Sequence, residues 1–306
     1  MKKTKQNIKH WIQKKVRSFN YLLIEETANQ IAYIHRVEYF NNLAINSINP
    51  GISGDKYCDK EIIISLTTYG KRLYEVYLTI ESIMQQTLKP NKIVLWLSYD
   101  LENTELPIVL KNQQKRGLEI RFCKDIRSYT KLIPSLKTFP EAVIITIDDD
   151  ILYNFDLIEN LFNAYLKNKG IIHCTRMHRM KLLKQNTIEK YDKWFYESES
   201  LDFSSKNFPT GIGGVLYPPN CFNEEVFNET VFLDICKYAD DVWFKAMALY
   251  NGTMSQKILT HNKNGNDYFI NKISQYTSLS SINSGMQLND IQIKAVFDKY
   301  NLYNKL

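Results

Sequence analysis

The sequence has no long apolar stretch. Its uninterrupted apolar runs span only a few residues, whereas a helix that crosses a bilayer needs about 20. The basic start also lacks the apolar segment that follows the charges of a signal peptide, because His10 is followed by Trp-Ile-Gln-Lys-Lys. We therefore expect a chain that neither spans a membrane nor is secreted, and that works in the cytoplasm.

No two cysteines form a C-x-x-C pair that would suggest a zinc site or a redox site. The five cysteines are widely spaced and odd in number, at positions Cys58, Cys123, Cys174, Cys221 and Cys236. We expect reduced thiols that mostly pack in the interior of a cytosolic protein. Internal repeats and low-complexity tracts are also missing, and 306 residues with 44% apolar composition suffice for one main core.

Carboxylates are missing from residues 1–20, which carry Lys2, Lys3, Lys5, Lys9, Lys14, Lys15 and Arg17. The formal net charge is +6, so removing the +7 of this segment leaves −1 for residues 21–306. A nucleic-acid binder needs a basic face on its folded domain to displace phosphate counterions. The neutral remainder predicts no nucleic-acid partner.

The basic segment has a helical apolar pattern. The apolar positions recur every three to four residues, the spacing of one helix face, at Trp11, Ile12, Val16, Phe19, Leu22 and Leu23. Two interpretations stay open: a helix that packs on the main domain, or a basic helix in which residues 1–24 lie on an anionic membrane, peripheral on the inner face of the cell membrane. With a linker over 45–60, residues 1–60 form the expected N-terminal extension.

The middle of the chain alternates strand and helix patterns. Strands are predicted at 61–66, 92–97, 118–122 and 142–147, with helices at 73–84 and 130–137. This order predicts an α/β fold, a mostly parallel sheet with helices on both faces, over residues 61–270. Residues 271–306 are expected to form a C-terminal helical tail.

Three acids follow the last of these strands directly. If the chain is still extended there, Asp148 and Asp150 point the same way and Asp149 points to the other face. Two carboxylates this close repel each other unless a cation neutralises them, which favours Mg²⁺ or Mn²⁺. The alternative is three aspartates solvated in a turn. Ligands of parallel sheets collect beyond the carboxyl ends of the strands, where these acids lie.

Three motifs together resemble a known family. Asp-x-Asp after a strand, the first-strand sequence Ser65-Leu66-Thr67-Thr68-Tyr69 and the later Asp240-Asp241-Val242-Trp243-Phe244 are similar to bacterial polysaccharide glycosyltransferases of the GT-A fold, family 2. The resemblance covers roughly residues 61–265. It implies a metal-dependent enzyme that moves a sugar from a nucleotide-diphosphate donor, UDP being expected, to a hydroxyl of a glycan or lipid-linked glycan. Capsule or lipopolysaccharide synthesis would be the setting.

The resemblance also implies roles for the donor-side residues. Thr67 and Tyr69, with Thr68 between them, would face the base, Asp148 the ribose and Asp150 the metal. The extra middle acid leaves the register open by one residue, so Asp149 can take one of these roles and Asp148 can be a metal ligand.

Other residues would complete the site. Some members of such families place a late histidine on the metal or diphosphate, here His261, and the glycine-rich loop with Gly213 and Gly214 would lie against the donor sugar or acceptor. Arg72 and Lys131 are candidate cations for the charge that develops on a leaving diphosphate.

The acidic pair is the candidate for the general base. Asp241 is expected to take the acceptor proton, with Asp240 as the second choice, and the alternative is that both acids only cap a helix. The sequence from His261 to Gly265 lacks the Lys-Pro-Trp ending of a retaining family, so an inverting reaction is favoured.

Two other functions compete with the transferase. In an aspartyl phosphatase, Asp148 would be the nucleophile and Asp150 the acid, but Leu152 stands where such enzymes have Thr or Val. The third possibility is a sugar-binding or membrane-surface module without catalysis.

Overall fold

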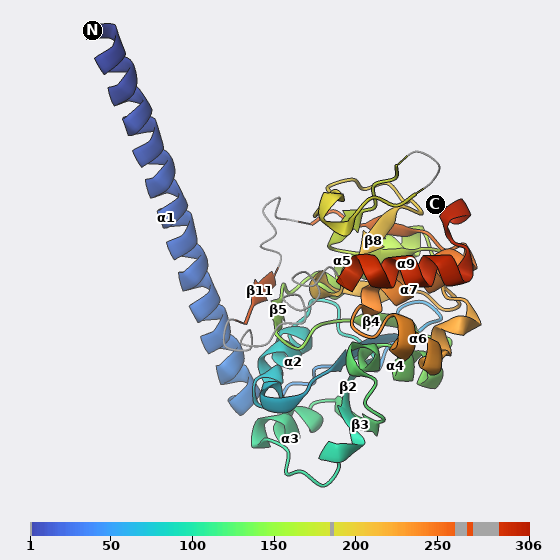
Figure 1. Cartoon of the computed structure of the whole chain (residues 1–306). Coiled ribbons are helices and arrows are strands. Elements are labelled where there is room, and N and C mark those ends of the chain that lie inside the picture. The colour runs from blue at the N-terminus through green and yellow to red at the C-terminus, as the bar shows by residue number, and fades with distance from the viewer. Residues whose placement is uncertain (1, 184–186, 261–267, 272–287) are drawn as a thin grey trace.

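The protein is described here by a computed structural model covering residues 2–183, 187–260, 268–271 and 288–306 (Figure 1). The strands are β1 (Ile62–Thr67), β2 (Lys92–Ser98), β3 (Leu118–Cys123), β4 (Val143–Thr146), β5 (Ile151–Tyr153), β6 (Ile172–Cys174), β7 (Met177–Arg179), β8 (Asn207–Pro209), β9 (Val215–Tyr217), β10 (Ser255–Lys257) and β11 (Tyr268–Ile270). The α-helices are α1 (Lys2–Asn46), α2 (Val76–Met84), α3 (Ile108–Gln114), α4 (Ile133–Thr138), α5 (Leu157–Lys167), α6 (Glu229–Ile235), α7 (Asp240–Asn251) and α9 (Leu288–Tyr300).

Seven strands form the central sheet, in the order β10-β6-β9-β4-β1-β2-β3. β1 pairs in parallel with both β2 and β4, and β2 with β3. β6 pairs in parallel with β10, whereas β9 is antiparallel to its neighbours β4 and β6. The sheet is therefore mostly parallel, and β9 alone among these seven strands runs the other way.

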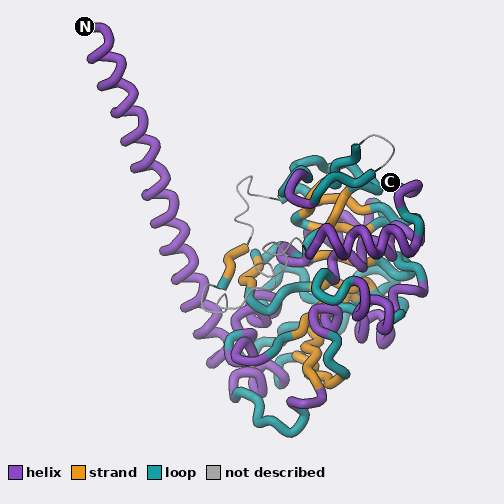
Figure 2. The backbone as a smooth tube through the Cα atoms, in the orientation of Figure 1, coloured by secondary structure: helices purple, strands orange, loops and turns teal. Residues whose placement is uncertain are grey.

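Helices cover both faces of this sheet (Figure 2). Alternate residues of β1 enter different cores: Ile62 and Ile64 pack with α2, α3 and α5, whereas Ile63 packs with α4, α6, α7 and α9. Burial on both faces explains why the strands read as nearly continuous apolar runs. The predicted α/β architecture, a mostly parallel sheet with helices on both faces, is confirmed.

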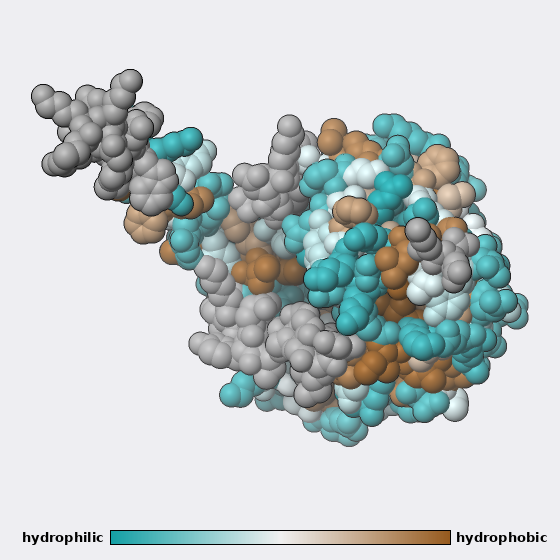
Figure 3. All heavy atoms as spheres, turned by 45° about the horizontal axis from the view of Figure 1, so that its top comes forward, coloured by the Kyte–Doolittle hydropathy of each residue, from teal (hydrophilic) through white to brown (hydrophobic). Residues whose placement is uncertain are grey.

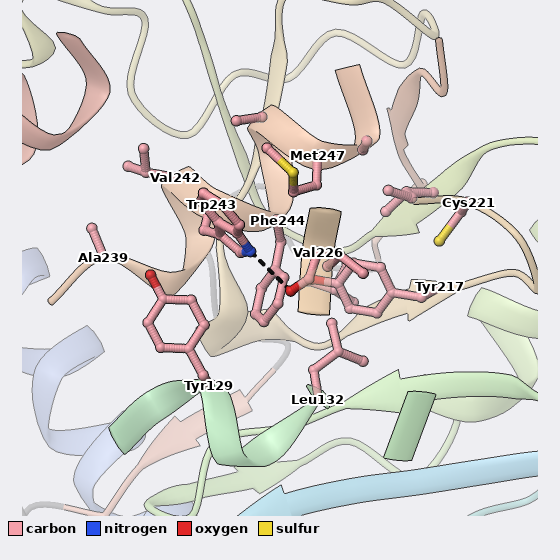
Figure 4. Packing of buried hydrophobic residues seen from close by; sticks show 14 of the residues in the cluster. Tyr129, Leu132, Tyr217, Cys221, Val226, Ala239, Val242, Trp243, Phe244 and Met247 are labelled. Atoms are coloured by element: carbon pink, nitrogen blue, oxygen red, sulfur yellow. Dashed lines mark hydrogen bonds between the residues drawn. The ribbon is translucent and has the colours of Figure 1, made fainter. Parts of the chain in front are cut away.

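Helix α7 is anchored through its aromatic residues. Trp243 is fully buried, and its Nε1 donates a hydrogen bond to the Val226 carbonyl oxygen at 3.1 Å (Figure 4). Phe244, Tyr129 and Tyr217 pack in the same cluster. This packing fixes the first turn of α7, with its two aspartates, beside the sheet.

Helix α1 is longer than the pattern predicted, and its two halves differ. In the second half Phe40 and Ala44 are fully buried, the Arg36 guanidinium lies 4.4 Å from the Phe155 ring centroid, and the Tyr33 hydroxyl donates to Asn271 Oδ1 at 2.9 Å. Side chains 14–24 are all exposed, and the helix projects from the rounded body (Figure 1). The helix extends to Asn46, inside the linker expected over 45–60, because apolar residues of its second half pack on the domain.

The apolar residues that follow Lys257 favour a strand at 257–260, but β10 is observed earlier, at Ser255–Lys257, where backbone pairing with β6 is available. Within the described ranges, no helix combines the length and the apolar character that a bilayer crossing requires.

Candidate functional site

The candidate site lies where the chain order of the sheet reverses. β1 is bonded to β2 on one side and to β4 on the other, and ligands of such sheets bind in the crevice beyond the carboxyl ends of the strands at this switch. β1 ends at Thr67 and β4 at Thr146, so residues 67–69 and 148–150 meet at one edge. A cavity of about 530 Å³ opens there, a size typical of small-molecule sites.

Asp149 is the most tightly held of the three acids. It is 7% exposed, and its carboxylate accepts hydrogen bonds from Thr68 Oγ1 at 2.6 Å and Arg72 Nη1 at 2.8 Å. Arg72 Nη1 also lies 3.2 Å from Asp150 Oδ2. The predicted alternation is wrong at this point: β4 ends at Thr146 and residues 149–150 form a turn, so Asp149 and Asp150 converge on Arg72.

The burial of the acids also excludes the solvated-turn alternative. Asp149 and Asp150 are both buried, and burial raises the pKa of each, that of Asp150 to about 7 with a further contribution from Asp148. A cation bound beside these carboxylates would lower their pKa values again and stabilise their ionised form.

Lys131 connects the triplet to the second acidic pair. Its Nζ lies 3.0 Å from Asp148 Oδ1 and 3.2 Å from Asp240 Oδ2. Burial alone would lower the pKa of Lys131, but Asp148 and Asp240 raise it well above its usual value, so the ammonium stays charged. The predicted cation therefore lies inside the site, between acids from two different elements.

Asp241 faces the same cavity from the first turn of α7. Its Oδ2 accepts a hydrogen bond from the Gly211 N–H at 3.3 Å, and burial, together with the adjacent Asp240, raises its pKa to about 7. The N-cap of α7 is Ala239, and no side chain caps the helix, so the capping alternative has no hydrogen bond to support it. A carboxyl that titrates near neutral pH suits proton transfer.

The glycine that lines the cavity is Gly211, which the sequence did not single out. The predicted Gly213 and Gly214 lie against other side chains: Gly213 against Thr175, which donates to its carbonyl at 2.7 Å, and Gly214, with a φ of +94°, against Leu157. These two glycines shape the loop, and Gly211 makes room at its centre.

Gly211→Ala should reduce turnover at this site by about 10- to 100-fold, because reacting groups tolerate little misplacement. A Cβ at Gly211 would lie 2.8 Å from Lys131 Nζ and 3.4 Å from Asp148 Oδ1. The flexible lysine end must move, so turnover should fall while the melting temperature stays near that of the wild type. Gly54→Ala, whose Cβ would meet no atom within 4 Å, is the matched control. Equal turnover in both variants would remove Gly211 from the reacting centre.

Aromatic rings from the β7–β8 region and from the segment before α7 also line the cavity; we call these residues the aromatic wall: His178, Tyr191, Tyr196, Phe208 and Tyr238. Burial lowers the pKa of His178 to about 4, with Arg176 adding to the effect, so the ring is neutral and its Nδ1 accepts from the Glu197 N–H at 3.0 Å. In the sequence, His178 and Arg176 belong to a polar stretch, His173 to Arg179, that carries no recognised motif. Tyr191 and Tyr196 had no local signal, because the fold alone brings them here.

The carboxylates fit part of a metal site. Among the described residues no group of three His, Cys, Asp or Glu side chains is arranged to hold a metal, and the predicted ligand His261 lies outside the described residues. Asp148 and Asp150 nevertheless offer oxygen ligands in an acidic cavity, and Mg²⁺ or Mn²⁺ needs few protein ligands where waters and substrate phosphates supply the rest. The two aspartates therefore fit a hard divalent cation bound together with a phosphate ligand.

The sequence matches no protein-family model and no curated protein. Solved structures that are similar to it include two of TarS residues 1–349 from S. aureus, each at 14% identity and a TM-score of 0.42. The first covers 66% of this chain and 58% of the TarS chain; the second, a complex with UDP, covers 76% and 65%. This chain thus spans less than two thirds of either TarS chain, and the likeness concerns the course of the backbone alone.

Proposed function

We propose that the protein is a metal-dependent glycosyltransferase that moves a sugar from a nucleotide-diphosphate donor to a hydroxyl of a glycan or lipid-linked glycan. One observation carries the proposal. A single cavity at the switch point of the sheet is lined on one side by Asp148, Asp149 and Asp150, and on another by Asp241, a carboxyl whose pKa is near 7. Donor diphosphate and acceptor hydroxyl can therefore meet in one place.

The donor half would use the ends of β1 and β4. Tyr69 is 53% exposed beside the Arg72 guanidinium and offers a ring face to a nucleotide base, uracil being expected from the family resemblance. Asp148 and Asp150 would hold Mn²⁺ or Mg²⁺, which would neutralise diphosphate charge. Lys131, which stays charged at the bottom of the cavity, would stabilise the charge on the leaving diphosphate.

The chemical step is a single displacement. The acceptor oxygen forms a bond to the anomeric carbon, the bond from that carbon to the diphosphate oxygen breaks, and the electron pair leaves with the diphosphate. Asp241 takes the acceptor proton, and the Gly211 N–H orients its carboxylate. Attack opposite the leaving group inverts the anomeric centre.

The aromatic wall would bind the acceptor. Sugar rings present C–H faces that pack on aromatic rings, and Tyr191 and Tyr196 lie near His178 with ring centroids 5.9 Å and 4.5 Å away. An extended glycan could run along this wall, which suits a surface-polysaccharide acceptor.

The deciding experiment screens nucleotide sugars for thermal stabilisation with Mn²⁺ present, then follows transfer and donor hydrolysis with Mn²⁺ and with EDTA. Metal-dependent release of the nucleotide diphosphate supports the transferase. Cleavage of a simple phosphate monoester without use of any nucleotide sugar would favour the phosphatase. Stabilisation by a sugar nucleotide without turnover would identify a binding module.

We further propose that the projecting part of α1 binds anionic membranes reversibly. Val16, Phe19 and Leu23 are exposed at helical spacing in a segment rich in cations, and Figure 3 shows apolar and polar side chains side by side on the described part of the projection. Peripheral attachment at the inner face of the cell membrane would bring the site to a lipid-linked acceptor.

In flotation assays the full chain should bind anionic vesicles at low salt and release them as salt rises, since the Debye length falls from about 10 Å at 0.1 M to about 3 Å at 1 M. Replacing Lys14, Lys15 and Arg17 by Gln should weaken binding at low salt. Glu26→Gln, on the same exposed segment, is the matched control and should not weaken it. If the full chain floats no better than the neutralised variant, the membrane contact is wrong.

A further inference from the structure

A second, much smaller cavity also borders Asp241. Its volume is about 10 Å³, the room that one water molecule requires. Its walls include Asp241, Lys245, Ser255 and Tyr217. Asp241 also lines the large cavity, so this residue borders both the proposed reaction site and the small cavity.

Two buried polar groups at the small cavity lack partners. Lys245 is 3% exposed, and neither its Nζ nor Ser255 Oγ has a hydrogen-bond partner in the part of the chain that the structure describes. A buried ammonium or hydroxyl without a partner is costly, and internal waters in proteins usually satisfy such groups. Lys245 follows Asp241 by four residues in α7, so both side chains are on the same face of the helix.

We propose that Lys245 is a positioning residue: it holds one internal water against Asp241 and keeps that carboxylate ionised until the acceptor hydroxyl arrives. The role given to Asp241 rests on the proposed function. The physical reason is that a positive charge one water away favours the ionised form of a carboxyl, opposing the burial that favours the neutral form.

The other titratable groups around Lys245 do not change charge near neutral pH. Burial raises the pKa of Cys174 on β6 to about 12 and that of Tyr217 on β9 well above its usual value. Burial lowers the pKa of Lys245 to about 7, near that of Asp241, whose charged neighbours include Asp240, Lys131 and Asp148. Asp241 and Lys245 therefore have similar pKa values, so their titrations must be followed together.

The test that needs no enzyme activity is an NMR titration of ¹³C-labelled aspartate carboxyl groups, with Asp241→Asn identifying the signal of interest. Lys245→Met keeps the length and apolar volume of the side chain and removes its charge. We expect the midpoint of the Asp241 carboxyl titration in Lys245→Met to rise by at least about 1 pH unit. Lys245→Gln, which can still bond a water but carries no charge, should also raise it. An unchanged midpoint in both variants overturns the proposal.

Lys257→Met is the matched control. Lys257 is also buried, but its Nζ donates to Glu199 at 2.7 Å, so its loss should leave the Asp241 midpoint where it was. An equal rise in this variant would show a general effect of removing buried lysines, and would overturn the specific role of Lys245.

Kinetics then separate a positioning role from a structural one. In Lys245→Met the acid limb of the kcat/KM profile should move to higher pH by the NMR shift, with the donor KM above that limb unchanged. Ser255→Ala should give a smaller shift in the same direction. A lowered melting temperature with an unmoved acid limb would mean that Lys245 is structural. If the wild type transfers no sugar at all, the proposed function is wrong. The water-mediated interaction between Lys245 and Asp241 is then still tested by the NMR titration.

Discussion

Asp241→Asn should lower the rate of sugar transfer by about 10² to 10⁴, the usual contribution of a positioned general base, while donor binding persists. The amide keeps the shape of the side chain but cannot take a proton. The acid limb of the wild-type kcat/KM profile should lie near pH 7, since protonated Asp241 cannot act as a base and its pKa in the free protein is about 7. That limb should be missing from the residual activity of the variant. Transfer rates over pH 5–9 and nucleotide affinity by calorimetry are the measurements.

Asp240→Asn provides the comparison from the same helix turn. Asp240 lies 3.2 Å from Lys131 Nζ, whereas the Gly211 N–H bonds to Asp241. We therefore expect Asp240→Asn to lower the transfer rate less than Asp241→Asn does, and to do so through Lys131. Should Asp240→Asn be the more damaging change, the roles of the two acids are exchanged. Should Asp241→Asn lose donor affinity and turnover together, Asp241 belongs to the donor site, and the base is another residue.

The strands of the sheet core could be predicted from sequence because burial on both faces leaves a run of apolar residues. The predicted strands 61–66 and 92–97 are observed as Ile62–Thr67 and Lys92–Ser98. The short strand β10 gave no such signal, because it is Ser-Gln-Lys and depends on its pairing with β6. The length of α1 was missed because its two halves have different surroundings, the first projecting and the second packing on the domain.

Within the site, the sequence allowed us to recognise residues at strand and helix ends, but not the contacts that their side chains make with one another. Asp148, Asp150 and Asp241 follow or begin buried elements, a position that a sequence pattern can indicate. The turn after Thr146, which brings Asp149 and Asp150 to Arg72, depends on local backbone geometry. Lys245 lies among apolar residues of α7, and only the packed structure shows that its Nζ is buried without a hydrogen-bond partner among the described residues.

Asp150→Ala should abolish the divalent-ion dependence of nucleotide-diphosphate binding. Loss of an outer partner of a metal ligand already costs about 10- to 100-fold in metal affinity, so loss of the ligand itself should cost about 100-fold or more. Calorimetry with UDP in Mn²⁺ should show the affinity of Asp150→Ala falling to the level that the wild type has in EDTA. The fold should survive, because the Asp150 carbonyl, which accepts from the Asn271 N–H at 2.7 Å, is unchanged, and Arg72 keeps its bond to Asp149.

Asp234→Ala is the control for this experiment, since Asp234 is an exposed acid on α6 outside the lining of the cavity. It should bind UDP as the wild type does, with the same difference between Mn²⁺ and EDTA. Equal UDP affinity of the wild type in Mn²⁺ and in EDTA would contradict the metal site altogether. In that case Arg72 and Lys131, the cations that pair with the acid triplet in the described structure, would be the groups that neutralise the diphosphate, and Lys131→Met would be expected to cause the loss predicted here for Asp150→Ala.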